Sequence, residues 1–103
     1  MLVDLNRIKK HLNIDAEFTE DDEYLTFLEG VAEDLVQKHI DITFEKLEAQ
    51  EGEIPSPLLS AILLFIGNMY DNRESVAYTS VTELPMSLKY ILEMYRSYER
   101  SNI

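Results

Sequence analysis

The sequence feature that most constrains the fold is the apolar stretch within residues 56–74. Ser56 and Pro57 are typical of a helix start, because Ser caps free N–H groups and Pro suits the first turn. On a helical wheel, apolar side chains cover well over half of the circumference, so this helix must be surrounded by other elements. A membrane span is the competing interpretation. It needs roughly 20 apolar residues, and Ser60 and Gly67 interrupt the run. We therefore predict the central helix of a soluble helical domain.

The chain has 103 residues, which is the size of one domain, and we expect residues 1–103 to form a single helical domain. A domain of this size buries only a modest core, so contact with neighbouring molecules would add to its stability. The absence of cysteine excludes a disulfide framework and a thiolate metal site. No long apolar segment follows Arg7, so the start lacks the layout of a signal peptide. We expect a cytoplasmic product with no membrane segment.

Acidic residues dominate the composition and are concentrated in the first half of the chain. The net charge is −11, and 15 of the 20 acidic residues but only 5 of the 9 basic ones precede Pro55. Because DNA binding needs clustered Lys and Arg, this distribution argues against affinity-bearing contact with DNA. A solvated surface is the simplest interpretation. A basic protein partner, or a channel to which DNA must not adhere, would also suit an acidic surface.

The periodicity of apolar residues predicts an all-α fold, a small bundle of about four helices. The expected helices lie at about residues 4–12, 20–40, 57–72 and 86–99. The segment between the second and third helices, residues 41–55, is ambiguous. Its apolar residues would suit a short helical turn or a brief strand, and it ends in a loop signal. Residues 75–82 form a long loop before the last helix, or an extended arm that packs against a neighbouring subunit.

Local signals refine the first two helices. Asp4 suits the N-cap of the first helix and Asn13 its left-handed C-cap. Thr19 with Asp22 approximates a capping box at the start of the second helix. Gly30 lies inside the second helix, where Gly costs on the order of 1 kcal/mol relative to Ala. We therefore expect a neighbouring helix to pass close to Gly30.

The residue types needed for catalysis, cofactor binding or metal binding do not come together in this sequence. The two His residues lie near predicted helix ends, and the three Gly residues form neither a Gly-x-Ser-x-Gly turn nor a phosphate-binding loop. Residues 21–23 lack the alternation of a calcium loop. Carboxylate pairs such as Glu29 and Glu33 carry no specificity among so many acids, and we place both on a solvated face. We predict no catalytic residue, no cofactor, no metal and no enzymatic activity.

Aromatic and methionine residues gather near the C-terminus. They are Met86, Tyr90, Met94, Tyr95 and Tyr98. Such residues are enriched at protein contacts, and they are equally consistent with an ordinary core. Both interpretations remain open from the sequence.

Short motifs then occur in a definite order along nearly the whole chain. They comprise Leu5, Ile8, Lys9, His11, Leu12, Ile14 and Asp15, then Pro57, Ala61, Ile62, Leu63, Leu64, Tyr70, Asn72, Arg73 and Glu74, and finally Leu84, Pro85, Leu88, Leu92, Tyr95 and Arg96. In this order the sequence resembles the head–tail connector, or adaptor, family of long-tailed bacteriophages and prophages. The end of the central helix, Tyr70-x-Asn72-Arg73-Glu74, is the most specific part. An acidic insert around residues 45–53 and the extension beyond Arg96 depart from the family pattern.

The resemblance implies a structural role in the virion. Members of this family are mostly helical and assemble as a homo-oligomeric ring below the portal protein of the filled capsid. They continue the DNA channel and present a docking surface for the next tail or head-completion protein. DNA would pass through without sequence-specific binding. The protein would lie at the head–tail junction of the virion, and in the host cytoplasm during assembly.

Seven residues are the candidates for interface or structural roles. They are Tyr70, Asn72, Arg73, Glu74, Tyr78, Leu84 and Pro85. The guanidinium group of Arg73 can bind a carboxylate through two hydrogen bonds, either within the same chain or on a neighbouring subunit. Simple capping of the helix end is the alternative role for Arg73. The alternative function for the whole chain is a small acidic helical regulatory module that binds a basic protein partner.

Overall fold

The computed structural model describes residues 1–72 and 86–96 of the chain. These residues form helices and no strand, which confirms the all-α fold. The helices are α1 (Leu5–Leu12), α2 (Asp22–Ile40), α3 (Phe44–Glu51), α4 (Ser56–Asp71) and α5 (Met86–Tyr95). The described part thus holds one helix more than the predicted four, because the ambiguous segment forms α3. The arm expected at residues 75–82 lies outside the described residues.

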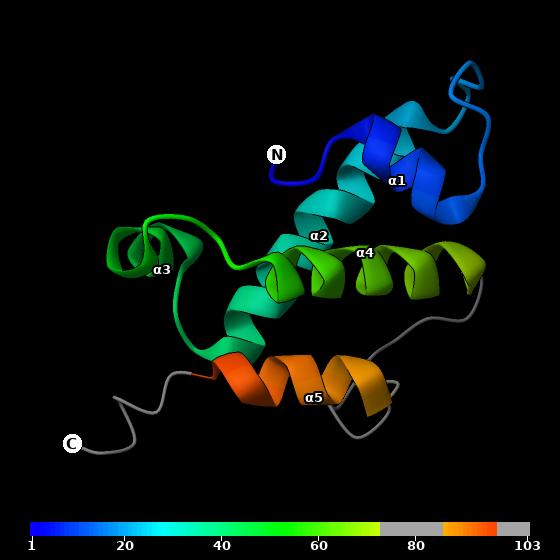
Figure 1. Cartoon of the computed structure of the whole chain (residues 1–103). Helices are drawn as coiled ribbons and strands as arrows, with labels where there is room; N and C mark the ends of the chain where they lie inside the picture. The colour runs from blue at the N-terminus through cyan, green and yellow to red at the C-terminus, as the bar shows by residue number, and fades with distance from the viewer. Residues whose placement is uncertain (73–85, 97–103) are drawn as a thin grey trace.

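Helix α4 occupies the centre of the fold, as its apolar sequence predicts. It contacts α1, α2 and α5, and Figure 1 shows it running between α1 and α5 and across α2. Its side chains Leu58, Ala61, Ile62, Phe65 and Ile66 have no exposed surface. Each large side chain buried in this way contributes about 1.5–3 kcal/mol before conformational entropy is subtracted. Among the described residues, none of the helices combines the length and apolar character that a membrane crossing requires.

The start of α4 lies one residue earlier than the sequence suggests. Pro55 holds the N-cap position with φ −57° and ψ 139°, and no side chain caps the first N–H groups. Ser56 is the first helical residue, so the prediction that it caps the helix was wrong. Pro57 lies in the first turn as expected, where its missing N–H leaves no hydrogen bond unmade.

The caps of α1 agree with the sequence, and the cap of α2 does not. Asp4 accepts a hydrogen bond from the Arg7 backbone N–H at 2.9 Å, and Asn13 adopts the left-handed conformation with φ 60°. Asp21, not Thr19, is the N-cap of α2, and it makes no side-chain capping bond. The predicted capping box is absent because α2 begins at Asp22, so Thr19 and Asp22 do not hold the N-cap and N3 positions that a capping box needs.

Helix α3 is a capped helix with one buried face. The Thr43 hydroxyl accepts from the Lys46 backbone N–H at 3.2 Å, and Gly52 ends the helix with φ 86°. Phe44 and Leu47 are buried, whereas the acidic residues of this segment are exposed. The Gln37 side chain of α2 accepts from the Phe44 backbone N–H at 2.8 Å, which fixes α3 to the end of α2.

Candidate functional site

Two of the seven candidate residues, Tyr70 and Asn72, lie in the described part of the chain, at the end of α4. The Tyr70 hydroxyl donates to Asp21 Oδ2 at 2.6 Å, and the Tyr70 ring lies 6.4 Å from the Tyr24 ring. Asn72 is the C-cap of α4. Its backbone N–H and its side-chain amide both donate to the Asn68 carbonyl, at 3.1 and 2.8 Å. Tyr70 therefore joins the end of α4 to the start of α2, and Asn72 closes the helix.

The other five candidates lie outside the described residues. They are Arg73, Glu74, Tyr78, Leu84 and Pro85. Their assignment as interface or structural residues remains a prediction, as does the role of Arg73 as an interface or capping residue.

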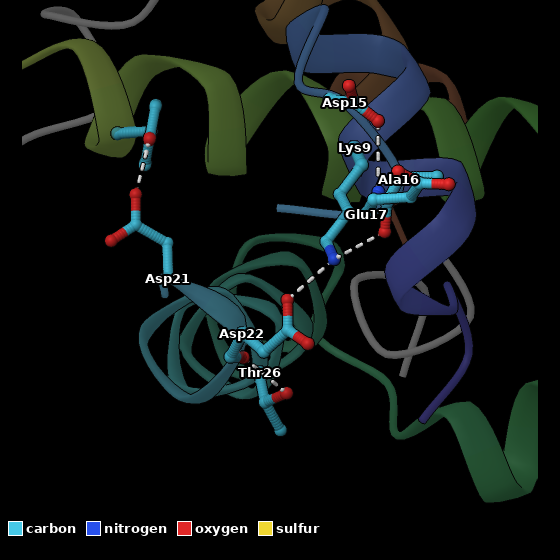
Figure 2. A network of polar contacts seen from close by, with 8 residues as sticks. Lys9, Asp15, Ala16, Glu17, Asp21, Asp22 and Thr26 are labelled. Atoms are coloured by element: carbon cyan, nitrogen blue, oxygen red, sulfur yellow. Dashed lines mark hydrogen bonds and ion pairs between the residues drawn. The ribbon is translucent and has the colours of Figure 1, made fainter. Parts of the chain in front are cut away.

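The acidic start of α2 binds two other parts of the fold. Figure 2 shows Lys9 reaching from α1 toward Asp22 and the Ala16 carbonyl. The Lys9 ammonium group lies 2.7 Å from Asp22 Oδ1 and donates to the Ala16 carbonyl at 3.3 Å. With the bond from Tyr70 to Asp21, two adjacent carboxylates hold α1 and α4 against the first turn of α2. Sequence analysis placed Asp22 in a capping box and missed the tertiary partners of both carboxylates, since those depend on the arrangement of the helices.

The outer face of α5 carries a row of exposed apolar side chains. Met86, Tyr90 and Met94 are 61%, 67% and 66% exposed. They recur every four residues, so they lie on one side of the helix, opposite the buried Leu88 and Leu92. A core position for these three residues, which the sequence left open, was therefore wrong.

A hollow of about 360 Å³ adjoins this row. It is lined by His39, Met86, Lys89, Tyr90, Leu92, Glu93 and Arg96. We call the surface formed by Met86, Tyr90, Met94, Lys89 and Arg96 the α5 patch. His39, from α2, stacks on Phe65 with ring centroids 6.2 Å apart. Burial, with a smaller effect of the Lys38 charge, lowers the pKa of His39 below its usual value, so it is neutral at pH 7.

A second exposed apolar surface lies toward the other end of α2. Phe27 is 63% and Met1 62% exposed. They line a hollow together with Thr26, Glu29, Gly30, Val31, Glu33 and Asp34. We call the surface formed by Met1, Phe27, Gly30, Val31, Glu33 and Asp34 the Phe27 patch. Apart from its chain neighbours and the backbone of α2, no atom of the described residues lies within 4 Å of a Cβ placed on Gly30, so none of the described helices makes the expected close approach there.

Glu29 lies beneath the Phe27 patch and is only 2% exposed, which contradicts its predicted place on a solvated face. Its Oε2 accepts from the backbone N–H groups of Leu2 and Val3, both at 3.2 Å. Glu33 also accepts from Leu2, at 3.1 Å. Burial, with a hydrogen bond to the Glu33 side chain as the next cause, raises the pKa of Glu29 from 4.5 to about 7. The two carboxyl groups thus hold the first residues against α2.

Within residues 1–72 and 86–96, no group of three or more His, Asp or Glu side chains is arranged to hold a metal ion. The described surfaces that stand out are instead the α5 patch and the Phe27 patch. Exposed Met and aromatic side chains are characteristic of protein contact surfaces.

The described residues form a small helical module with two exposed apolar surfaces. The family model of the phage gp6-like head-tail connector protein matches residues 2–100, and the chain belongs to this family. No curated protein and no solved structure matches the chain in the corresponding searches. Family membership indicates a structural role in a bacteriophage virion, at the junction of head and tail.

Proposed function

We propose that this chain is the subunit of a ring that lies below the portal protein of a DNA-filled phage head. The ring extends the DNA channel and docks a tail or head-completion protein. The observation that carries this proposal is the match of residues 2–100 to the phage gp6-like head-tail connector family. The protein acts by binding and positioning other virion proteins, with no catalytic step.

The surface chemistry supports a role beside DNA without binding it. The net charge of the chain is −11, and the exposed side chains of α2 and α3 include many carboxylates. Such a surface repels the phosphate backbone and lowers the residence of DNA on the channel wall. DNA therefore passes through the ring without sequence-specific contacts.

A stop codon in this gene of the phage or prophage tests the proposal. We expect DNA-filled heads and separate tails to accumulate, and the intact gene supplied in trans to restore joined particles. Electron microscopy counts the joined particles, and mass spectrometry of purified virions detects the protein. Particles that join normally without it, or purified virions that lack it, would overturn the proposal and favour a regulatory module.

A further inference from the structure

We propose that the α5 patch of one copy of this chain binds the Phe27 patch of a second copy, so that copies associate head to tail. This inference rests on the proposed function, because it names the contact between successive subunits of the ring. Four observations carry it: the apolar match, the charges, Gly30 and the positions of the two patches.

The two patches match in apolar character. Phe27 and Met1 project from one patch, and Met86 and Tyr90 line the hollow of the other, with Met94 exposed on the same side of α5. That hollow, about 360 Å³, is large enough to receive an aromatic side chain such as Phe27. Aromatic and Met side chains that bury one another in this way supply much of the stability of a protein contact.

The charges at the margins of the patches are complementary. Lys89 and Arg96, together with Glu93, line the hollow of the α5 patch, whereas Glu33 and Asp34 line that of the Phe27 patch. The α5 hollow thus has two cationic side chains and one carboxylate, whereas the charged side chains that line the Phe27 hollow are all acidic. Opposite charges at such margins favour the correct pairing and speed encounter, and like charges oppose other pairings.

Gly30 gives an independent indication that another chain approaches α2. A glycine at an exposed position within a helix costs on the order of 1 kcal/mol relative to Ala. Among residues 1–72 and 86–96, and apart from the chain neighbours of Gly30 and the backbone of α2, no atom lies within 4 Å of its Cβ position to explain the cost. Gly30 lines the same hollow as Phe27. The absence of a side chain there leaves space for a residue of a second copy.

The positions of the patches require the contact to be between copies. Phe27 and His39, which lines the α5 hollow, are twelve residues apart on α2. At 1.5 Å per residue this separation is about 18 Å along the helix axis. The patches therefore do not meet within one chain. Because they are different surfaces, their pairing repeats from copy to copy, and it forms a ring when the rotation closes.

Disulfide cross-linking tests the contact, since the chain has no cysteine of its own. Two full-length variants, Thr26→Cys and Glu93→Cys, place a thiol beside each hollow without removing its apolar side chains. They carry tags of different mass and are mixed under oxidising conditions. We expect the mixed dimer in clear excess over a statistical distribution of dimers. Glu45→Cys on exposed α3 replaces Thr26→Cys in the control and should pair without preference. A mixed dimer no more frequent than in this control would overturn the inference.

Charge reversal provides a second test that keeps the apolar residues intact. Lys89→Glu alone and Asp34→Lys alone should each weaken association of the chain about tenfold or more, because each places like charges together. The double variant should recover most of the loss. Lys46→Glu, an equal charge change on α3, is the matched control and should have little effect. Sedimentation velocity measures the association; failure of the double variant to recover would count against the contact.

The tests separate this inference from the proposed function. If the stop codon blocks head–tail joining but cross-linking shows no preference, the role in the connector stands and the contact named here is wrong. Substitutions in the α5 patch can also be tested for binding to purified portal rings. If they reduce that binding but do not reduce cross-linking between copies, the α5 patch contacts the portal and not a second copy, and the inference is likewise overturned.

Discussion

Lys9 is a lysine with only 4% of its surface exposed, and its ammonium group holds three segments together. The group bridges α1, the Ala16 carbonyl in the following loop and the Asp22 carboxylate at the start of α2. A buried ammonium group is tolerated only when its charge and its hydrogen-bond donors are satisfied. The helical periodicity of α1 does not reveal this role, because the sequence places Lys9 among two other basic residues at a helix end.

Replacing this lysine should therefore destabilise the fold. Lys9→Met keeps much of the side-chain volume but leaves the Asp22 carboxylate without its cation. We expect the free energy of unfolding to fall by about 1–3 kcal/mol, less than for a fully buried pair because Asp22 is partly exposed. Urea denaturation measures the change. Lys10→Met, at an exposed neighbouring position, is the control; equal effects of the two variants would contradict the role of Lys9.

Glu29 should make stability depend on pH. Its pKa is raised from 4.5 to about 7, so the folded protein holds a proton that the unfolded chain releases above about pH 4.5. The contribution of Glu29 to stability therefore decreases as pH rises from about 4.5 to about 7. Glu29→Gln keeps an acceptor for the Leu2 and Val3 N–H groups and removes this decrease.

At pH 8 we expect the Glu29→Gln variant to be more stable than the natural protein by about 1–3 kcal/mol. Near pH 4.5 the two proteins should differ little. Thermal or urea unfolding followed across this pH range measures the difference. Parallel pH profiles for the two proteins would show that Glu29 does not titrate as described.

At the scale of the elements, the nearly continuous apolar run made α4 predictable, and weak periodicity concealed α3. Because α4 has apolar residues on most sides, it must be surrounded by other helices, and this is what the structure shows. Helix α3 has only two buried residues among exposed acids. Its cap, Thr43, and its end, Gly52, are ordinary signals that become persuasive only once Phe44 and Leu47 are seen to face the core. The packing of this short helix against the core, more than its local sequence, therefore accounts for its formation.

Replacing Gly30 with Ala measures the effect of this glycine on the stability of the fold. Gly30→Ala should raise the free energy of unfolding of the chain by about 1 kcal/mol, because Ala has the higher helix propensity and a Cβ fits without contact. Urea denaturation at low protein concentration checks this. Gly67→Ala in α4 is an informative second variant, since a Cβ there lies 3.6 Å from the His11 ring. A loss of stability with Gly30→Ala would contradict the open surroundings of Gly30.

Helix α3 depends on its cap more than a long helix does. Thr43→Ala removes the hydroxyl that accepts from the Lys46 N–H. We expect the loss of about 1 kcal/mol of stability. Thr43→Ser should retain most of it, because the serine hydroxyl can accept the same bond. Denaturation of the two variants under the same conditions measures the contribution of the cap to stability. Equal losses of stability in the two variants would exclude the hydrogen bond as the cause.

For the whole molecule, the sequence predicted the family and the helical class, left the α5 residues open between a contact surface and the core, and did not indicate the Phe27 patch. Tyr70 bonds to Asp21 and Asn72 bonds to the Asn68 carbonyl at the end of α4, and their part in an interface remains a prediction. The α5 patch and the Phe27 patch depend on which side of each helix the core covers. That choice is fixed only when all helices pack. Phe27, for example, lies on the side of α2 that faces away from the core.

The overall charge leads to a prediction about DNA. With a net charge of −11, the chain should not retard duplex DNA in a gel even at low salt, where attraction to phosphate is strongest. A basic protein of similar size serves as the positive control. Retardation that weakens steeply as salt increases would reveal a concentrated basic surface and would oppose the proposed channel role.

The bond from Tyr70 to Asp21 spans 49 residues of sequence, and this separation has a consequence for the order of folding. As the chain leaves the ribosome, α1 and α2 emerge first, and Lys9 can meet Asp22 at once. The side of α2 that carries Leu25, Ala32 and Val36 stays uncovered until α4 has been made. The nascent chain therefore presents an apolar helix face for the time needed to synthesise some thirty further residues, during which its acidic residues disfavour aggregation.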